Sequence, residues 1–387
     1  MMYGIKVPLK PTEEQKLKFQ DHFDVSRWVF NNMLAWRKMI YKESPFTGEK
    51  IRLRVKVDAH SMMRRLNDLI KKNPWLRKAP RDVMNQAVMN LHRAFVNFFE
   101  GRANFPKFKK KSNHCQSAGY PCGVRVSDDY KRVWIPKIGW VKANVYRNIP
   151  DGAKIKTCTL KRASTAKYYM SLLIDDGLKY PKKLTEVDDV VGLDLGLTHL
   201  FITSEGEKVD NPKFLKKAQD NLRRKKRKYS RKKKGSKNQE KARIVVAKRE
   251  AQVANKRETY QHQMIAATLK DVQAVGLETL QVKNMQKNRK LSKAIADASW
   301  GAFGTRIETR MQRTGGHLVK IDRFFPSSKT CYVCGEVLDK LPLSVRNWTC
   351  PCCRVKHDRD INAAINIRKE AASILKQKGV TVLEDEY

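Results

Sequence analysis

The chain has 387 residues, enough for two or three domains, and carries a formal net charge of +42 from 81 Lys and Arg against 39 Asp and Glu. So large a surplus of like charge would repel itself without a polyanion, so the composition favours a nucleic-acid partner over a merely soluble basic protein. The sequence has no run of 18 or more apolar residues, and its first residues lack the apolar core of a signal peptide. We therefore expect a cytoplasmic protein without a transmembrane helix.

The N-terminal region predicts one strand followed by helices. Residues 3–9 alternate like a strand, and a helix with Thr12 as its N-cap is expected to follow. Further helical stretches lie near 58–72 and 81–100, and the apolar residues of the last recur at helical spacing. Residues 11–104 are therefore predicted to be largely helical.

Short alternating runs begin near residue 105 and continue to about 182, with turn residues between them. This pattern predicts a small antiparallel β-barrel or sheet, which the strand at 3–9 can join, so that the helical block becomes an insertion. Two phenylalanines interleave with Lys107 and Lys109. That mixture suits contact with a nucleic-acid backbone and stacking on bases, although a solvated loop has the same pattern.

Three cysteines also lie in this region, at positions 115, 122 and 158. We expect free thiols. The less favoured alternative is a second metal site formed by Cys115, Cys122 and His114.

A linker at 181–183 leads to a hydrophobic strand in the motif GLDLG, which carries Asp194. In residues 213–249, which follow, roughly half of the positions are Lys or Arg, and a helical hairpin broken near Gly235 is expected. A run of charge is usually a solvated face, but this density favours contact with nucleic acid. The candidate contacts are Arg223, Arg224 and Arg227.

Two further carboxylates, like Asp194, lie in short motifs on predicted strands or helices. Glu278 ends a predicted strand in the motif GLETL, and Asp360 starts the closing helix in HDRDINAA, with Asp358 as a rival. The order of elements is strand with Asp, hairpin, strand with Glu, strand and helix with Asp, which predicts an RNase H-like fold. Carboxylates suit Mg²⁺ because hard cations prefer oxygen ligands, and two such ions can hydrolyse a phosphodiester.

Each of these acids also has a structural reading when it is taken alone. Asp194 could cap a strand end, Glu278 could pair with a basic residue, and Asp360 could N-cap its helix. The combination of all three in this order favours the metal site.

Five of the eight cysteines fall within residues 331–353 and form two CxxC pairs about fifteen residues apart. The four ligands would be Cys331, Cys334, Cys350 and Cys353, and Cys352 is left over. This spacing predicts a tetrahedral Zn²⁺ ribbon, and a closed shell of four thiolates makes the zinc structural rather than catalytic. Its expected role is to fix the loop that places Asp360 against the strands of Asp194 and Glu278.

The chain resembles the TnpB family, the RNA-guided nucleases encoded by bacterial insertion sequences, and the compact type V CRISPR effectors related to it. The match rests on GLDLG (192–196), GLETL (276–280), SSKTCYVCG (327–335), NWTCPCC (347–353) and HDRDINAA (357–364). This resemblance implies that Asp194, Glu278 and Asp360, rather than Asp358, are the RuvC-type catalytic residues.

The resemblance also implies an α+β multidomain architecture. Its parts would be a wedge-type β-barrel (1–10 and 105–183), an inserted helical recognition lobe (11–104), an RNase H-like RuvC nuclease domain (184–326 and 355–387) and an inserted zinc ribbon (327–354). The implied cofactors are two Mg²⁺ ions and one structural Zn²⁺. The implied partners are an omega-type guide RNA and double-stranded target DNA, bound by a monomer associated with a prokaryotic nucleoid.

In the family, polar side chains read a short motif beside the target, and Gln86 lies on a helix that resembles one of these readers. A solvent-facing helical glutamine is an equal alternative. Two other functions stay open. A guided DNA-binding regulator that does not cleave is disfavoured because all three acids are present, and a DNA-strand transferase would share the core and the acids.

Overall fold

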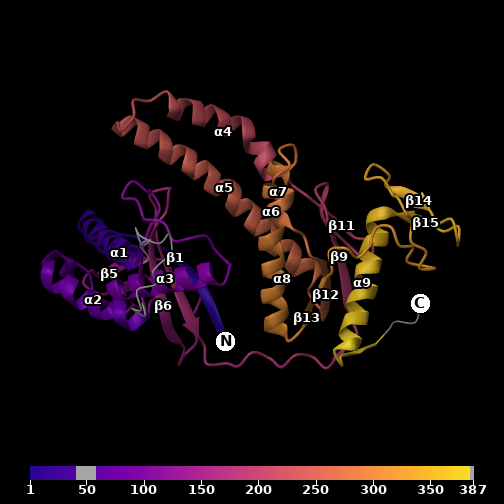
Figure 1. The fold of residues 1–387 in the computed structure, drawn as a ribbon, viewed down its shortest axis with the longest axis horizontal. Coiled ribbons are helices and arrows are strands. Elements are labelled where there is room, and N and C mark those ends of the chain that lie inside the picture. Colours follow the sequence, from indigo (N-terminus) through magenta and orange to yellow (C-terminus); the bar gives the residue numbers. More distant parts are fainter. Residues whose placement is uncertain (41–57, 384–387) are drawn as a thin grey trace, which may run out of the picture. The chain divides into compact units, whose positions relative to one another are not determined.

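The computed structural model describes residues 1–40 and 58–383, and the chain divides into two compact units, Met1–Leu178 and Lys179–Tyr387 (Figure 1). Each unit combines helices with its own main sheet, so the chain is an α+β multidomain protein. None of the helices within the described ranges has the length and apolar character needed to cross a bilayer.

The first unit contains a seven-stranded antiparallel sheet with β1 at its centre. In spatial order the strands are β2 (Gln116–Tyr120), β6 (Lys154–Arg162), β7 (Tyr168–Asp175), β1 (Met2–Lys10), β5 (Gly139–Ala143), β4 (Arg132–Ile135) and β3 (Arg125–Val126). The predicted strand at 3–9 therefore joins the later strands. The hydrogen-bonded order of the described strands is that of an open sheet with β2 and β3 at its edges, and the expected barrel stays a prediction.

The helices described in the first unit are α1 (Glu13–Ile40), α2 (Ala59–Lys72), the short 3-10 helix η1 (Pro74–Lys78) and α3 (Arg81–Phe99). Of these, α1 and α3 pack against β2 of the sheet, and α2 packs against α3. Thr12 caps α1 as the sequence predicts, because its hydroxyl accepts from the Gln15 amide at 3.2 Å. Alternate residues of β1 are buried, and they share one apolar core with α1 and α3.

The second unit contains a five-stranded mixed sheet. Its spatial order is β11 (Lys208–Asp210), β10 (His199–Thr203), β9 (Val190–Leu195), β12 (Ala274–Glu278) and β13 (His317–Ile321). Strands β9, β12 and β13 pair in parallel, whereas β10 pairs antiparallel with both of its neighbours, β9 and β11. The predicted order of an Asp strand, a hairpin, a Glu strand and a further strand is therefore observed.

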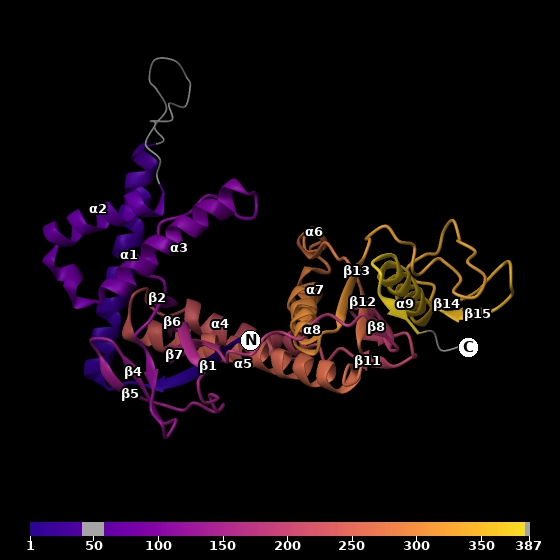
Figure 2. The ribbon, with the colours of Figure 1, turned by 90° about the horizontal axis from the view of Figure 1, so that it is seen from below.

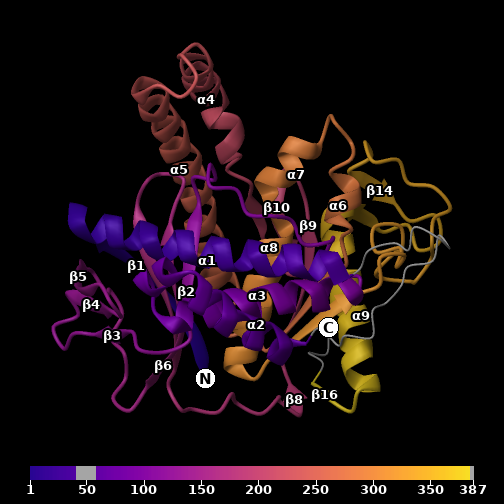
Figure 3. The same ribbon diagram turned by 60° about the vertical axis from the view of Figure 1, so that its left-hand side comes forward.

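Helices and small strand pairs complete the second unit. They are α4 (Phe214–Ser230), α5 (Lys237–Thr268), α6 (Val282–Met285), α7 (Ser292–Ala298), α8 (Trp300–Thr314), α9 (Arg359–Gln377), the pair β8 (Glu186–Val187) and β16 (Thr381–Val382), and the pair β14 (Asn347–Thr349) and β15 (Lys356–Asp358). The basic helices α4 and α5 form the predicted hairpin (Figure 3). It breaks where expected, since Gly235 has a φ of 81° and Ser236 caps α5.

The two faces of the mixed sheet have different partners (Figures 1 and 2). One face carries Val191, Leu193 and their β12 neighbours, and it packs against α5 and α8. The other face carries Val190 and Ala274, and it packs against α9. Because side chains alternate along a strand, Asp194 and Glu278 belong to the α9 face.

Two glycines allow α9 to lie close to this face. Gly192 and Gly276 are register partners on β9 and β12. A Cβ atom on Gly192 would lie 2.5 Å from the Arg368 amide nitrogen and closer still to the Ala364 carbonyl oxygen, whereas a Cβ atom on Gly276 would lie 2.9 Å from the Ile367 carbonyl oxygen. The helix backbone therefore occupies the space of the missing side chains.

This contact generates a prediction. Gly192→Ala forces α9 away from the sheet, and overpacking against backbone costs on the order of 3 kcal/mol of unfolding free energy. Gly301→Ala is the matched control, because no atom lies within 4 Å of its added Cβ, and it should be neutral or slightly stabilising. Calorimetric unfolding and hydrogen exchange of α9 measure both. Equal stability of the two variants would contradict the packing described here.

Candidate functional site

The carboxylates of Asp194 and Glu278 lie at the same edge of the mixed sheet. Leu193 and Leu277 are partners in the parallel pairing of β9 with β12. One residue further along, Asp194 and Glu278 stand beside each other near the carboxyl ends of their strands and face α9. In open α/β sheets this edge is where ligands bind.

The third acid enters from the start of α9. Asp360 is the second residue of this helix, and it is partly buried. The rival Asp358 is the N-cap: its carboxylate accepts from the amides of Asp360 and Ile361 at 3.0 and 3.1 Å and pairs with Lys208 at 2.6 Å. Asp358 is thus engaged in capping, whereas the charge of Asp360 acts on Asp194.

The charges of the other two acids act on Asp194. The pKa of the Asp194 carboxyl is raised to about 8, first because the group is buried among protein atoms and then because Glu278 and Asp360 repel its ionised form. Arg359 and Arg346 oppose this shift. A carboxyl that resists ionisation beside two other acids is a place where a cation would be favoured.

Two neighbours hold the other carboxylates. The Ser327 hydroxyl donates to Glu278 Oε1 at 2.6 Å. The Arg346 guanidinium lies 3.0 Å from Asp360 Oδ1, and its side chain is 61% exposed. Among the described residues, only the cysteine cluster gathers three or more metal-ligand atoms into a set that could hold one ion. The charges of Glu278 and Asp360 reach Asp194, but the three acids are not gathered into a set of that kind among these residues.

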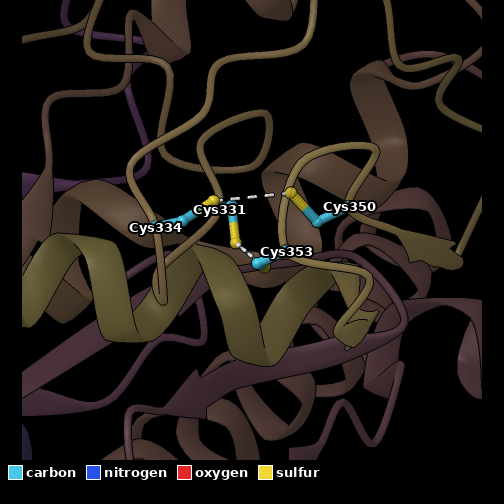
Figure 4. Close-up of side chains that lie close together, drawn as sticks. All are labelled: Cys331, Cys334, Cys350 and Cys353. Carbon is cyan, nitrogen blue, oxygen red and sulfur yellow. Dashed lines mark hydrogen bonds between the residues drawn. The ribbon is translucent and has the colours of Figure 1, made fainter.

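Four cysteines come together in the zinc module, which we define as residues 327–354, the segment that precedes α9 (Figure 4). Their sulfurs all lie within 4.8 Å of one another, with Cys331–Cys353 and Cys334–Cys350 at 3.6 Å. A tetrahedral zinc site with Zn–S bonds of about 2.3 Å has sulfur–sulfur edges of about 3.8 Å. Disulfide sulfurs would stand at about 2.05 Å. The spacing therefore fits a structural zinc site, as the sequence predicts.

The two CxxC turns have the same backbone. The amides of Gly335 and Arg354 donate to the carbonyls of Cys331 and Cys350 at 2.9 and 3.0 Å, and both residues have a positive φ, 79° and 67°. Cys352 is exposed and lies outside the cluster. The repeated turn explains the choice of ligands, because Cys353, and not Cys352, occupies the position equivalent to Cys334.

Several residues that link this module to α9 were not predicted. Asn362 and Asn366 are buried on α9, and their amides donate to the carbonyls of Ser327 and Thr330 at 2.6–3.3 Å. His357 is buried, and its Nε2 lies 3.1 Å from Cys331 Sγ. All of these residues except Asn366 lie in the motifs SSKTC and HDRDINAA, and Asn366 lies two residues beyond the second motif. Neither motif indicates which side chains meet.

The predicted nucleic-acid residues are placed differently from one another. Arg223 and Arg227 line a cavity of about 910 Å³ beside α4 and α7, whereas Arg224 does not line it. Leu197 and Thr198, which follow Asp194 closely in sequence, also line this cavity. The cavity is rich in cations, with Lys213, Lys216, Lys226, Lys290 and Lys293 in its wall.

In the first unit, Lys107 and Lys109 are both exposed residues, and Lys109 is in addition held in place. Its ammonium lies 4.1 Å from the centre of the Phe30 ring, desolvation of the ammonium there lowers its pKa, and its backbone exchanges two hydrogen bonds with Asn31. Gln86 is partly buried and donates to Asn90. Its side chain also packs over Gly119, so it is not a fully solvent-facing glutamine.

The remaining cysteines of the first unit do not form a second metal group among the described residues. Cys115 and Cys122 are exposed free thiols, and Cys122 Sγ lies 3.3 Å from Asp82.

Three family profiles match the chain. One described as "Cas12f1-like, TNB domain" covers residues 300–367, and one described as "Probable transposase" covers 174–289. A third, described as a helix-turn-helix domain, covers 1–44. In the described part of that last range the structure has β1 and the single long helix α1 rather than two helices.

Whole-length relatives agree with these profiles. A Streptomyces pristinaespiralis protein provisionally named RNA-guided DNA endonuclease is 34% identical over 95% of this chain and 90% of its own length. Escherichia coli (strain K12) InsQ, with the same provisional name, is 26% identical over 97% of this chain and 93% of its own. The structure of a Cas12f1–sgRNA–target DNA complex has the same fold, with a TM-score of 0.57 and 16% identity, over 92% of this chain and 83% of Cas12f1. The chain belongs to the TnpB family.

Proposed function

We propose that this chain is an RNA-guided DNA endonuclease that binds a guide RNA, recognises a short motif beside its target and hydrolyses DNA phosphodiesters. The observation that carries the proposal is that Asp194 lies within electrostatic reach of Glu278 and Asp360 at one edge of the mixed sheet. Burial first, and then repulsion from these two acids, raises the pKa of Asp194 to about 8. The names of the relatives, including the 34% identical Streptomyces protein, support the same activity.

The three carboxylates fit divalent cations. They offer only oxygen ligands, which Mg²⁺ prefers. Burial first, and then repulsion from Glu278 and Asp360, raises the pKa of Asp194, and a bound cation would offset both effects. When bound, such ions supply Lewis acidity that activates water and stabilises the leaving oxygen of a phosphodiester. In this proposal Asp194, Glu278 and Asp360 are the catalytic ligands, and two Mg²⁺ ions are the cofactors.

Neighbouring side chains prepare this site. Ser327 orients Glu278 through its short hydrogen bond, which leaves the second carboxylate oxygen for a cation. Arg346 neutralises Asp360 and is well exposed. If Asp360 served as a metal ligand, the exposed Arg346 guanidinium would be available to pair with a phosphate of the substrate.

We extend the proposal to the domains. The first unit would be the wedge-type barrel with its helical recognition lobe, and the second would be a RuvC-type RNase H-like nuclease domain with residues 327–354 as an inserted zinc ribbon. The cationic cavity at Arg223 and Arg227 would contact the nucleic-acid backbone, because phosphate contacts supply affinity without reading sequence. Gln86, Lys107 and Lys109 would contribute contacts in the first unit.

The proposal predicts loss of cleavage in Asp194→Ala. The purified protein with its co-purified RNA should cut a plasmid that carries the guide complement and adjacent motif in Mg²⁺, and the variant should be slower by at least about 1,000-fold. The control Asp188→Ala removes an exposed acid just before β9 and should cut like the parent. Undiminished cleavage by Asp194→Ala would refute the site.

The description "Probable transposase" makes a DNA-strand transferase the second candidate. Strand joining without RNA would support it. Tight co-purification of RNA would count against it, and sequence-specific binding without cutting in Mg²⁺ would favour a guided regulator.

A pH dependence follows from the pKa of Asp194. This pKa is about 8 in the folded chain, against an ordinary value of 3.8 for aspartic acid. The folded state therefore binds one more proton between these values, and the parent loses stability relative to Asp194→Asn as the pH rises from about 4 to 8. The difference changes by up to about 1.4 kcal/mol per pH unit and then levels off. Thermal unfolding in chelator measures it, and Mg²⁺ should reduce it. A difference that is independent of pH would contradict the buried acid.

Loss of zinc should lower DNA cleavage because it should allow α9, which carries Asp360, to shift. Cys350→Ser should abolish the bound zinc, loosen the contacts of the module with Asn362 and Asn366, and lower cleavage strongly. The control Cys352→Ser lies outside the cluster and should retain both zinc and cleavage. Metal analysis and the plasmid assay measure them. If Cys352→Ser alone lost zinc, the ligand set would be wrong.

A further inference from the structure

The outer face of the strands β3, β4 and β5 carries a ladder of arginine and tryptophan. Arg125 pairs with Trp134, and Trp134 pairs with Trp140, so three neighbouring strands place these side chains in one row. Arg132 and Lys142 are also register partners, two residues from the tryptophans, and stand on the same face. We name these five residues the aromatic–basic face.

The opposite side of the same strands is ordinary core. Val133, Ile135, Val141 and Ala143 are all buried in the first unit. The alternation is therefore complete, and the aromatic–basic face is turned outward. Trp140 is 40% exposed, which is unusual for so large an apolar side chain and is typical of binding surfaces.

The side chains of this face contact one another, with the two tryptophan rings edge to face. The Trp134 and Trp140 ring centres are 5.6 Å apart at an interplanar angle of 69°. The guanidinium of Arg125 lies 5.2 Å from the Trp134 ring, and that of Arg132 lies 5.6 Å from the Trp140 ring. The two arginines are exposed. Each therefore keeps a planar side available for a further stacked group.

The charge of this face indicates which kind of chemical group would bind to it. Residues 125–142 contain five Lys or Arg and two acids. The acids, Asp128 and Asp129, lie in the turn between β3 and β4, and Asp129 is bound to Ser127 and the Lys131 amide. The aromatic–basic face itself has no acid. Planar groups joined by anions, as in unpaired nucleotides, complement such a surface.

We infer that the aromatic–basic face binds unpaired nucleotides of RNA, whose bases stack on the Trp and Arg planes while their phosphates contact Arg125, Arg132 and Lys142. RNA is the occupant because unpaired loops are the form in which RNA presents bases for stacking. The choice of RNA rests on the proposed function, in which a guide RNA is the resident partner. The site itself lies wholly in the first unit and needs none of the catalytic acids.

The test measures binding of a fluorescent, unstructured, adenine-rich RNA of about twelve nucleotides to the full chain stripped of RNA, at about 0.1 and 0.5 M salt. High salt weakens phosphate contacts elsewhere on this basic protein, so stacking dominates what remains. The double variant Trp134→Ala, Trp140→Ala should bind at least about tenfold more weakly at the higher salt, in line with stacking on aromatic side chains. Trp134→Phe with Trp140→Phe should restore most of the affinity.

Trp75→Ala is the matched control. Trp75 is 38% exposed and forms a similar edge-to-face pair with Trp28 at 5.6 Å, but it belongs to η1. This control should bind RNA like the parent, and thermal unfolding should show that all of the variants fold. Parent-like binding by the double alanine variant would overturn the inference, as would an effect seen only with DNA of the same sequence.

Failure of this inference is separable from failure of the nuclease proposal. Asp194→Ala should bind the short RNA like the parent although it does not cleave DNA. Loss of that binding in Asp194→Ala would show that the measured site is not the aromatic–basic face.

Discussion

The close contact between α9 and the mixed sheet is the constraint on which the candidate site depends. Gly192 and Gly276 are paired across β9 and β12, and the backbone of α9 fills the space that their side chains would occupy. Two residues further along each strand stand Asp194 and Glu278, on the same face. The glycines therefore set how closely the start of α9, and with it Asp360, approaches the other two acids.

The zinc module extends this constraint from the helix to the loop before it. Asn362 and Asn366 hold the carbonyls of Ser327 and Thr330, and Ser327 in turn donates to Glu278. Arg359 contacts the carbonyl of Pro342, inside the module. Asp360 thus lies on α9, the helix that the module contacts, and Glu278 is oriented by Ser327 in the module's own loop. Buried polar networks of this kind are rigid only when every member is satisfied.

Local patterns predicted the elements well, because they depend on neighbours in sequence. The alternation in residues 3–9, the Thr12 cap and the break at Gly235 are all local. The zinc ligands could also be predicted from the sequence, because two CxxC pairs at that spacing commonly bind zinc. The Ser327–Glu278 bond, the Arg346–Asp360 pair and the Arg–Trp ladder join residues that only the tertiary fold brings together. The sequence alone does not indicate how β3, β4 and β5 align with one another, so Trp134 and Trp140 could not be placed on one face.

The folded chain disfavours the ionised form of Asp194, and this favours a metal-binding role for the acid over a capping role. A strand-end cap or a simple ion pair would lower the pKa of a carboxyl, as Lys208 and the helix amides do for Asp358. Asp194 shows the opposite shift in a chain of net charge +42, because burial and two neighbouring acids outweigh Arg359 and Arg346. A protein so rich in cations could neutralise this acid with one nearby lysine. The fold instead leaves the repulsion in place, which is the arrangement that a divalent cation would complete.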